Sequence, residues 1–204
     1  DAQACAALAG LPLVRRPSGG GAIVHGSDLT YAVAVPRGHP WGGDPQVLYD
    51  AFHTALAGLL LEQGIAARLH PGRDRGAGDE LRFLCFDRRA RGDLVIEAGD
   101  QPDGHKILGS AQRRLQAAVL QHGSLLEESL SGLAEEARHP GLHELHPASA
   151  GRPVGRLAEA WLVRVAALTG GPLVRRGESF IESHAAETAA RAARFRSPAW
   201  LGRR

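Results

Sequence analysis

The apolar residues of this 204-residue chain change their spacing along its length, and this change limits the fold more than any other feature. Most of the first 126 residues divide into short apolar runs separated by Gly, Pro, Asp or Ser, as is typical of strands joined by turns. The expected strands are residues 22–25, 29–35, 81–86, 93–97, 106–111 and 119–126. Gly26-Ser27-Asp28 would form the turn of a hairpin between the first two.

Helical spacing of apolar residues appears over residues 46–64, and again late in the chain over residues 157–168 and 179–195. The alanine-rich residues 1–10 are expected to be the end of a further helix. Strand pairs followed by helices predict an α+β fold, with a mixed, largely antiparallel sheet flanked by helices. The length fits a single domain over residues 1–204.

The composition excludes several classes of protein. An apolar fraction of 44% and a charged fraction of 23% are globular values, and a net charge of +2 is too small to indicate nucleic acid. No run reaches the ~18 apolar residues of a membrane span, and no signal peptide opens the chain. Two cysteines make no disulfide framework, so a reducing cytoplasm is expected. The absence of methionine indicates that Asp1 is not the natural start and that an N-terminal segment is missing.

Lysine occurs once in the chain, at Lys106, against 23 arginines. It lies in the segment His105-Lys106-Ile107-Leu108-Gly109-Ser110-Ala111-Gln112-Arg113-Arg114. Arginine supplies positive charge everywhere else, so the retained lysine indicates a site that needs a compact ammonium on a flexible stem. Chance survival in an arginine-rich composition is the alternative.

Three consecutive glycines, Gly19, Gly20 and Gly21, follow Arg15-Arg16-Pro17-Ser18 and precede Ala22-Ile23-Val24-His25. Without Cβ atoms, a backbone can approach a ligand closely and direct several N–H groups at one point. Such a loop suits a carbonyl oxygen or a phosphate. A flexible turn is the alternative, but the flanking arginines and histidine favour a binding function.

Cys85 lies among large apolar residues, where a cysteine is usually a small buried hydrophobe. Neighbouring antiparallel strands could nevertheless bring it beside Lys106. A nearby ammonium favours the thiolate form, which is a competent acyl acceptor. The sequence therefore predicts Cys85 and Lys106 as a catalytic pair.

The remaining polar motifs give weaker signals. His122 is either structural or part of the site, and Cys5 is expected only to pack or to lie at the surface. The histidine spacing in residues 139–146 is similar to that of metal ligands, but proline breaks the segment, so no metal site is expected. Several arginines flank the proposed site, most of them expected to be solvated and a few available to an acidic carrier protein: Arg73, Arg75, Arg88, Arg89, Arg91, Arg113 and Arg114.

Over about residues 1–130, the order and spacing of these motifs resemble the lipoate–protein ligase and octanoyltransferase family. The matching segments are residues 15–25, 29–33, 93–95, 105–113 and 120–125. The resemblance implies a biotin/lipoate ligase-type catalytic domain, related to class II synthetase cores. Biotin itself is disfavoured, because the biotin ligases carry a different glycine-arginine loop.

The resemblance also implies roles for individual residues. Cysteine-type octanoyltransferases have a Cys-Phe pair upstream of the lysine motif, and Cys85-Phe86 looks like that pair. In them the cysteine takes an octanoyl group as a thioester from acyl carrier protein, and the lysine corresponding to Lys106 assists it. The acyl group then passes to a lysine of a lipoyl domain, such as glycine cleavage H protein or a dehydrogenase E2, without a cofactor. The residues that would bind the acyl group or an adenylate are Arg16, Ser18, Gly19, Gly20, Gly21, Ala22, His25, Gly109, Ser110, Ala111 and His122.

Further expectations concern the acyl chain and the oxyanion. Ile23, Val24, Leu108 and Leu120 would line an acyl tunnel. Backbone N–H groups near residues 19–21 or 109–111 would stabilise the oxyanion.

Three alternatives remain open on the sequence. The first is an ATP-dependent lipoate ligase that uses ATP and Mg²⁺ to make an acyl-adenylate. The second is an amidotransferase between lipoyl domains, and the third is an acyl-binding module without a nucleophile. The chain also departs from the cysteine-type enzymes, because residues 87–92 replace a Pro-Ser type sequence and residues 100–104 lengthen the turn before Lys106. Many ligases have a C-terminal accessory domain with no counterpart here, which favours the transferase.

Overall fold

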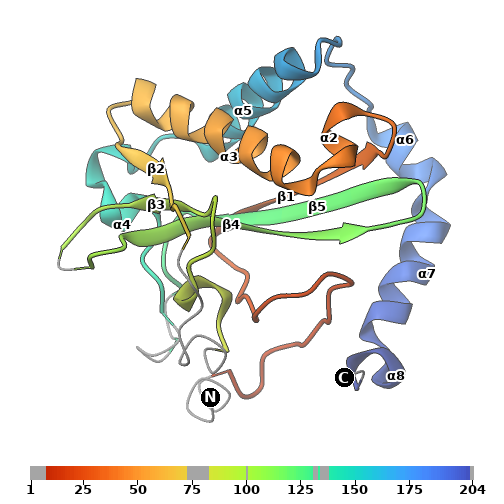
Figure 1. Ribbon diagram of the computed structural model, residues 1–204. Coiled ribbons are helices and arrows are strands. Elements are labelled where there is room, and N and C mark those ends of the chain that lie inside the picture. Colours follow the sequence, from red (N-terminus) through yellow and green to blue (C-terminus); the bar gives the residue numbers. More distant parts are fainter. Residues whose placement is uncertain (1–7, 73–82, 100, 131–132, 134–137, 203–204) are drawn as a thin grey trace.

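The computed structural model describes residues 8–72, 83–99, 101–130, 133 and 138–202. Its centre is one five-stranded antiparallel sheet with the strand order β1-β5-β4-β3-β2 (Figure 1). The strands are β1 (Asp28–Pro36), β2 (Ala67–Leu69), β3 (Leu94–Ile96), β4 (His105–Arg114) and β5 (Ala118–Leu126). The predicted α+β fold is confirmed, together with four of the six expected strands. The short strand β2 was not expected, because three residues are too few to show the alternation of apolar and polar residues that indicates a strand.

Two of the expected strands, residues 22–25 and 81–86, are not strands. β1 pairs with β5 along its whole length, from Asp28 opposite Leu126 to Pro36 opposite Ala118, so the predicted hairpin is wrong. In the described residues, one parallel bridge joins the two segments, between Ala22 and Leu84. After that bridge the chain turns into a 3-10 helix, η2 (Cys85–Asp87), while residues 81 and 82 lie outside the described residues. Beside the bridge, Leu84 is buried in a small hydrophobic cluster with Ala22, Val24 and Phe83.

The helices follow the sequence more closely. The expected helix at 46–64 is α3 (Pro45–Glu62), which begins with Asp44 as N-cap and proline at its first position. The expected helix at 157–168 is α5 (Val154–Thr169), which ends at Gly170 in the left-handed conformation. Residues 179–195 form two helices, α6 (Glu178–Ser183) and α7 (Ala185–Arg196), that are interrupted at His184. Among the described residues, no helix is long and apolar enough to cross a membrane.

Short helices also occupy four segments in which no helix was expected. They are α2 (Pro40–Gly43), α4 (Leu142–Leu145), η4 (Pro147–Ser149) and α8 (Pro198–Leu201). Residues 8–10 form a turn, and the remainder of the helix expected at 1–10 lies outside the described residues, as does Cys5.

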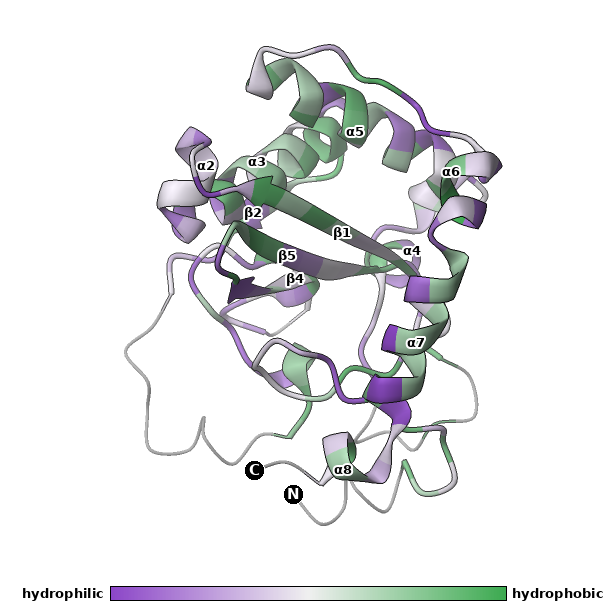
Figure 2. Ribbon diagram, turned by 90° about the vertical axis from the view of Figure 1, so that its right-hand side faces the viewer, coloured by the Kyte–Doolittle hydropathy of each residue, from purple (hydrophilic) through white to green (hydrophobic). Residues whose placement is uncertain are grey.

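The main hydrophobic core lies between the sheet and the helices α3 and α5, which cover one of its faces (Figure 1). Hydrophobic residues concentrate in β1, β5 and the helices above them (Figure 2). Tyr31, Phe52 and Trp161 stack at its centre, and Trp161 Nε1 donates to the carbonyl of Phe52 at 2.8 Å. The opposite face of the sheet is left to the glycine-rich segment before β1 and to η2, and the candidate site lies there.

A fully buried histidine on α3 makes the stability of this core pH-dependent. His53 Nδ1 donates to the carbonyl of Gly92 at 2.7 Å, and its Nε2 accepts from Ser110 Oγ at 2.7 Å, so the imidazole is held neutral. Burial lowers the pKa of His53 from 6.5 to about 4. Because the unfolded state binds this proton more readily, the stabilisation is complete above about pH 6.5 and is lost as the pH falls toward 4.

We expect His53 to remove about 3 kcal/mol of unfolding free energy between pH 7 and pH 4. Urea unfolding of wild type and His53→Gln at several pH values measures this contribution, because the variant cannot titrate at that position. Parallel pH dependences in the two proteins would contradict the assignment.

Candidate active site

Cys85 and Lys106 meet on the face of the sheet opposite α3. Lys106 on β4 places its Nζ 3.8 Å from Cys85 Sγ and 3.3 Å from the carbonyl oxygen of Cys85. The expected neighbouring strands do not bring them together. Cys85 instead opens the 3-10 helix η2, and the Lys106 side chain reaches down to that turn, where the carbonyl of Arg88 also accepts from Nζ at 3.4 Å. The turn leaves the thiol partly exposed, whereas Lys106 is only 5% exposed.

The residue that holds this lysine, Asp93, was not predicted from the sequence. Lys106 Nζ lies 2.8 Å from Asp93 Oδ2, and both side chains are almost completely buried. The carboxylate also accepts from Tyr49 Oη at 2.6 Å and from the backbone N–H of Ala90 at 2.7 Å. A signal was available, because an acidic residue at the start of the buried strand 94–96 needs a cation, and the chain has one lysine.

Asp93 connects the site to a polar network that crosses the sheet. Burial and the nearby Asp93 carboxylate raise the pKa of Tyr49 well above 10, so Tyr49 stays a hydrogen-bond donor to Asp93. Tyr49 Oη accepts from the backbone N–H of Ser110 at 3.1 Å, and Ser110 Oγ contacts Tyr31 Oη at 2.6 Å as well as His53. The pairing of β3 with β4 shifts register between Leu94 and Val95, directly after Asp93 in the chain. The side chain of Ser110 therefore belongs to the core side and not to the ligand side.

Gly109 is the position on β4 that leaves room for the lysine. A Cβ at Gly109 would lie 2.3 Å from Cε and 2.6 Å from Nζ of Lys106. The lysine side chain therefore lies directly against the backbone of the strand. Two residues further along β4, Ala111 pairs with His122 of β5.

The glycine loop packs against the backbone that carries the cysteine. Arg16 donates from its guanidinium to the carbonyl of Gly21 at 2.9 Å. Ala22 N donates to Phe83 O at 2.9 Å, and Cys85 N donates to Ala22 O at 2.8 Å. A Cβ at Gly21 would lie 2.7 Å from Phe83 O and 2.9 Å from Cys85 N. Glycine at 21 is thus required by the approach of two backbone segments.

Two histidines of the predicted site have separate partners. Ser18 Oγ and His122 Nε2 are 2.5 Å apart, and burial, followed by the positive charge of Arg16, lowers the pKa of His122. His25 Nδ1 lies 2.8 Å from Asp28 Oδ2, and this hydrogen bond raises the pKa of His25. His122 is thus placed as a neutral hydrogen-bonding group next to the loop.

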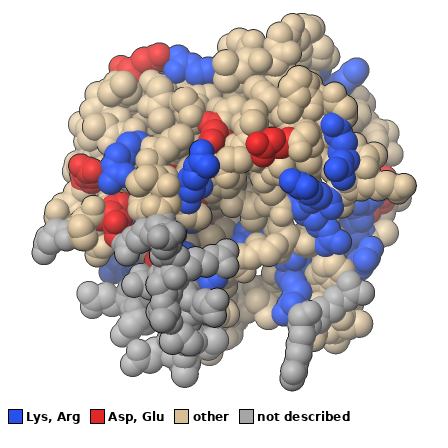
Figure 3. All heavy atoms as spheres, in the orientation of Figure 1, with Lys and Arg blue, Asp and Glu red and all other residues tan. Residues whose placement is uncertain are grey.

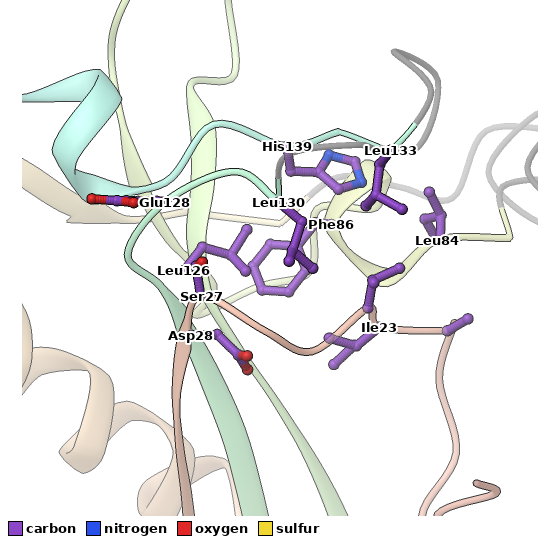
Figure 4. A pocket seen from close by; sticks show the side chains of 12 residues that line it. Ile23, Ser27, Asp28, Leu84, Phe86, Leu126, Glu128, Leu130, Leu133 and His139 are labelled. Carbon is purple, nitrogen blue, oxygen red and sulfur yellow. The ribbon is translucent and has the colours of Figure 1, made fainter. Parts of the chain in front are cut away.

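A small apolar pocket opens beside the cysteine (Figure 4). Leu84 and Phe86, which flank Cys85 in the chain, both line it, as do Ile23 and Val24 from the expected acyl tunnel. Its free volume is about 30 Å³, roughly that of one water molecule, so a longer ligand requires the lining side chains to move. Leu108 lies in the main core instead, so that expectation is wrong, whereas Leu120 does not line this pocket and its role stays a prediction. The complete lining is Ala22, Ile23, Val24, Ser27, Asp28, Leu84, Phe86, Leu126, Glu128, Leu130, Leu133 and His139.

Residues 2–160 match the lipoyl protein ligase A/B catalytic domain. The chain belongs to this family. Octanoyltransferase LipM of Staphylococcus epidermidis is 36% identical over 126 residues, covering 58% of this chain and 43% of the relative. LipM of Bacillus subtilis is 34% identical over 123 residues, covering 57% and 41%. The chain thus spans less than half of the length of the curated relatives that it matches.

Solved structures agree on the fold of this lipoyl protein ligase A/B domain. The protein Ta0514 from T. acidophilum, described as a putative lipoate protein ligase, aligns with a TM-score of 0.61 at 22% identity, over 92% of this chain and 70% of that one. Lipoate-protein ligase A bound with ATP aligns with a TM-score of 0.53 at 19% identity, over 80% and 61%. The biotin/lipoate ligase-type architecture expected from the sequence is therefore confirmed.

The arginines around the site of this lipoyl ligase-type domain have different roles. Arg89 donates to the carbonyls of Phe86 and Gly104, and Arg113 donates to Pro17 O at 2.6 Å, so both fix loops near the site. Arg91 lies 4.0 Å from Asp50 in an exposed pair. Arg73 and Arg75 lie outside the described residues. Among the part of the chain that the structure describes, no group of three His, Cys, Asp or Glu side chains could hold a metal ion.

The close packing of Gly21 yields a prediction for this family member. Gly21→Ala is expected to displace η2 and to lower the rate at which Cys85 reacts with iodoacetamide at least about tenfold, because the new methyl group overlaps two backbone atoms. Gly38→Ala is the matched control, since nothing lies within 4 Å of a Cβ at that position and it lies outside the glycine loop. Rates of alkylation of the two variants provide the measurement. Equal rates would show that the loop adapts without moving the cysteine.

Proposed function

We propose that this chain is a cysteine-dependent octanoyltransferase of protein lipoylation. The observation that carries the proposal is the position of Cys85 Sγ, 3.8 Å from the only lysine of the chain and between two residues that line an apolar pocket. The similarity to octanoyltransferases LipM supports the same activity. The proposed donor is octanoyl acyl carrier protein. The proposed acceptor is a lysine of a lipoyl domain, such as glycine cleavage H protein or a dehydrogenase E2.

The reaction proceeds in two acyl transfers. The Cys85 thiolate attacks the carbonyl carbon of the donor thioester, the donor's C–S bond breaks, and a new thioester forms on Sγ while the carrier leaves as a thiolate. The amine of the acceptor lysine then attacks this thioester, and the amide forms as Cys85 leaves. The first step exchanges one thioester for another and the second is downhill, so neither step needs ATP.

Lys106 assists the first step by its charge. An ammonium 3.8 Å from sulfur stabilises the thiolate, both before attack and when the cysteine leaves. The Asp93 carboxylate compensates part of that charge. The thiol therefore faces an oriented ion pair and not an isolated cation. The backbone of residues 109–111 is committed to β5 and, at Ser110, to Tyr49. The glycine loop at 19–21 is therefore the better candidate for oxyanion donors.

The apolar pocket is the candidate site for the alkyl chain. Each buried methylene contributes about 0.8 kcal/mol, which favours a medium-length chain over a short one. Leu130 and Leu133 line the pocket from the segment after β5 (Figure 4). Asp28 also lines the pocket, and its Oδ2 lies 2.8 Å from His25 Nδ1.

The carrier partner is expected to be acidic. Basic side chains gather on the side of the molecule where α6 and α7 lie (Figure 3). Arg191, Arg194 and Arg196 of α7 are all exposed there. Such a surface attracts an acidic carrier protein and increases its association rate.

An ATP-dependent ligase would need a place for Mg²⁺ and the phosphates. Both carboxylate oxygens of Asp93 are already engaged, by Lys106 and Ala90 on one side and by Tyr49 on the other, so this carboxylate does not fit a metal ligand in the observed arrangement.

The decisive experiment is intact-mass measurement of the protein after mixing with octanoyl acyl carrier protein in the absence of ATP. Wild type is expected to gain one octanoyl group, and Cys85→Ala is expected to gain none and to transfer nothing to H protein. Transfer by Cys85→Ala without ATP would overturn the mechanism. Modification of H protein only with free lipoate and ATP would instead select the ligase, and octanoyl-H protein as the sole effective donor would select the amidotransferase.

A further inference from the structure

Tyr49 is a buried residue of α3 whose hydroxyl reaches the ion pair beside the candidate nucleophile. Helix α3 covers the face of the sheet opposite η2 (Figure 1). Tyr49 is 9% exposed, and its hydroxyl donates to Asp93 Oδ1 at 2.6 Å. Asp93 Oδ2 lies 2.8 Å from Lys106 Nζ, and that nitrogen lies 3.8 Å from Cys85 Sγ. An unbroken series of contacts thus connects this tyrosine to the sulfur through two intervening side chains.

The direction of the hydrogen bond from Tyr49 is fixed by its other partner. The backbone N–H of Ser110 contacts the same hydroxyl oxygen at 3.1 Å, and an N–H can only donate. The single hydroxyl proton is therefore committed to Asp93, and burial raises the pKa of Tyr49 well above 10, so the proton stays there. At 2.6 Å the bond has the length of a charge-assisted O–H···O⁻ bond.

The backbone at Gly92 holds the ring of Tyr49 in place. Gly92 has a φ of +87°, and a Cβ at this position would lie 2.9 Å from Cδ1 of the Tyr49 ring. One turn further along α3, His53 donates from Nδ1 to the carbonyl of Gly92 at 2.7 Å, and the centroid of its ring lies 4.1 Å from that of Tyr49. The ring of Tyr49 is therefore fixed against the residue that directly precedes Asp93.

The carboxylate of Asp93 divides its hydrogen bonds between its two oxygens. Oδ2 accepts from Lys106 and from the backbone N–H of Ala90, and Oδ1 accepts from Tyr49. A buried acceptor that loses its donor costs free energy, so without the hydroxyl Oδ1 would attract a mobile donor. Lys106 is such a donor, and its contact with Sγ is longer than its contact with Asp93. Loss of the hydroxyl would thus draw the ammonium toward Asp93 and away from the sulfur.

We propose that Tyr49 is a positioning residue for the acyl transfer: its hydroxyl holds part of the Asp93 charge, so that the Lys106 ammonium remains beside Cys85. This inference deepens the proposed octanoyl transfer and rests on it for the identity of the nucleophile. Tyr49 acts through Asp93 and Lys106 and not on the substrate. It supports both steps, because the same thiolate attacks the donor and later leaves from the acyl-enzyme.

Alkylation by iodoacetamide at pH 7, followed by mass at the peptide that contains Cys85, tests this role in the full chain. Tyr49→Phe is expected to slow alkylation at least about fivefold, because the ammonium moves away from the sulfur. Tyr31→Phe is the matched control and should react as wild type. Its hydroxyl belongs to the same polar network, at 2.6 Å from Ser110 Oγ, but bonds on the core side of the sheet.

Two further measurements distinguish positioning from a role in folding alone. Asp93→Asn removes the carboxylate that competes for the ammonium and should speed alkylation, whereas a loosened site would change the rate of both variants in one direction. In the Asp93→Asn background, Tyr49→Phe should change the rate by less than about twofold, because its partner is gone. With octanoyl acyl carrier protein, Tyr49→Phe should lower the maximal rate of adduct formation and leave the KM unchanged, since Tyr49 is buried away from the carrier.

A conservative change to the hydroxyl tests the same role without removing it. Tyr31 and Tyr49 are the two tyrosines of the chain, so 3-fluorotyrosine incorporated into Tyr31→Phe labels Tyr49 alone. The fluorinated phenol is more acidic and donates a stronger hydrogen bond to Asp93. Alkylation should therefore be at least as fast as in unlabelled Tyr31→Phe, and slower alkylation would overturn the positioning role.

The outcomes separate the two proposals. If wild type gains no octanoyl group, the proposed function fails, while the alkylation rates still decide how Tyr49 affects Cys85. If wild type gains the group and Tyr49→Phe is alkylated and acylated at the wild-type rates, the positioning role is wrong while the proposed function stands. Equal slowing by Tyr49→Phe in the Asp93→Asn background would assign Tyr49 a role in folding and also overturn the positioning role.

Discussion

Lys106→Met is expected to lower the rate of octanoyl-Cys85 formation at pH 7 by at least about 100-fold. The substitution removes the ammonium that faces Sγ and leaves Asp93 as a buried carboxylate without its cation. The thiolate then loses its stabilising charge and faces a negative neighbour. Alkylation of Cys85 by iodoacetamide at pH 7 should also become slower. Alkylation and adduct formation, followed by mass, measure the two effects.

A double variant separates charge from folding in this experiment. Breaking a buried ion pair by removing one partner costs about 3–5 kcal/mol, whereas replacing both partners with apolar residues is often neutral. Lys106→Met combined with Asp93→Leu should therefore regain much of the stability and remain inactive. Recovery of the transfer rate in the double variant would show that Lys106 acts only through the fold.

Asp93→Asn should make Cys85 more reactive, in contrast to Lys106→Met, and should greatly lower the free energy of unfolding. The amide cannot neutralise Lys106, which is left as a buried cation, so the free energy of unfolding should fall by about 3 kcal/mol. In the molecules that remain folded, the uncompensated ammonium should make Cys85 react faster with iodoacetamide at pH 7. Urea unfolding gives the first quantity and alkylation under native conditions gives the second.

The exposed pair between Arg68 and Glu97 supplies the control for the stability measurement. Their atoms are 2.7 Å apart, but Glu97 is 69% exposed, so Glu97→Gln should cost no more than about 1 kcal/mol. A loss of this size in Asp93→Asn as well would mean that water enters and solvates the buried pair. Slower alkylation of the Asp93→Asn variant would mean that the carboxylate supports the thiolate indirectly, by holding Lys106 in place.

The strands and helices with strong periodic patterns were predictable from sequence, and so was the pairing of Cys85 with Lys106. The segments at 22–25 and 81–86 were not, because a run of four to six apolar residues has the same pattern whether it pairs in a sheet or packs beneath one. The contact between Cys85 and Lys106 is therefore made through the 3-10 turn η2 and the reach of the long lysine side chain.

The positions of the Asp93 and Ser110 side chains in the site could not be predicted from the sequence. Which face of β4 a side chain occupies depends on the register shift at Leu94 and Val95, and no local pattern indicates that shift. Ser110 was therefore expected among the ligand-binding residues, whereas it bonds to Tyr31 and His53 on the core side. The contact between Asp93 and Lys106 depends on the same geometry.

Helix α8 contacts the segment that precedes the glycine loop, far away in the sequence. Trp200 is buried, and its Nε1 donates to the carbonyl of Arg15 at 2.8 Å, one residue before the arginine that bonds to Gly21. Translation adds about 5–20 residues per second, so residue 200 is synthesised many seconds after residue 15. The loop that supports the nucleophile can thus be anchored only after residue 200 has been synthesised, so a shorter nascent chain lacks this support.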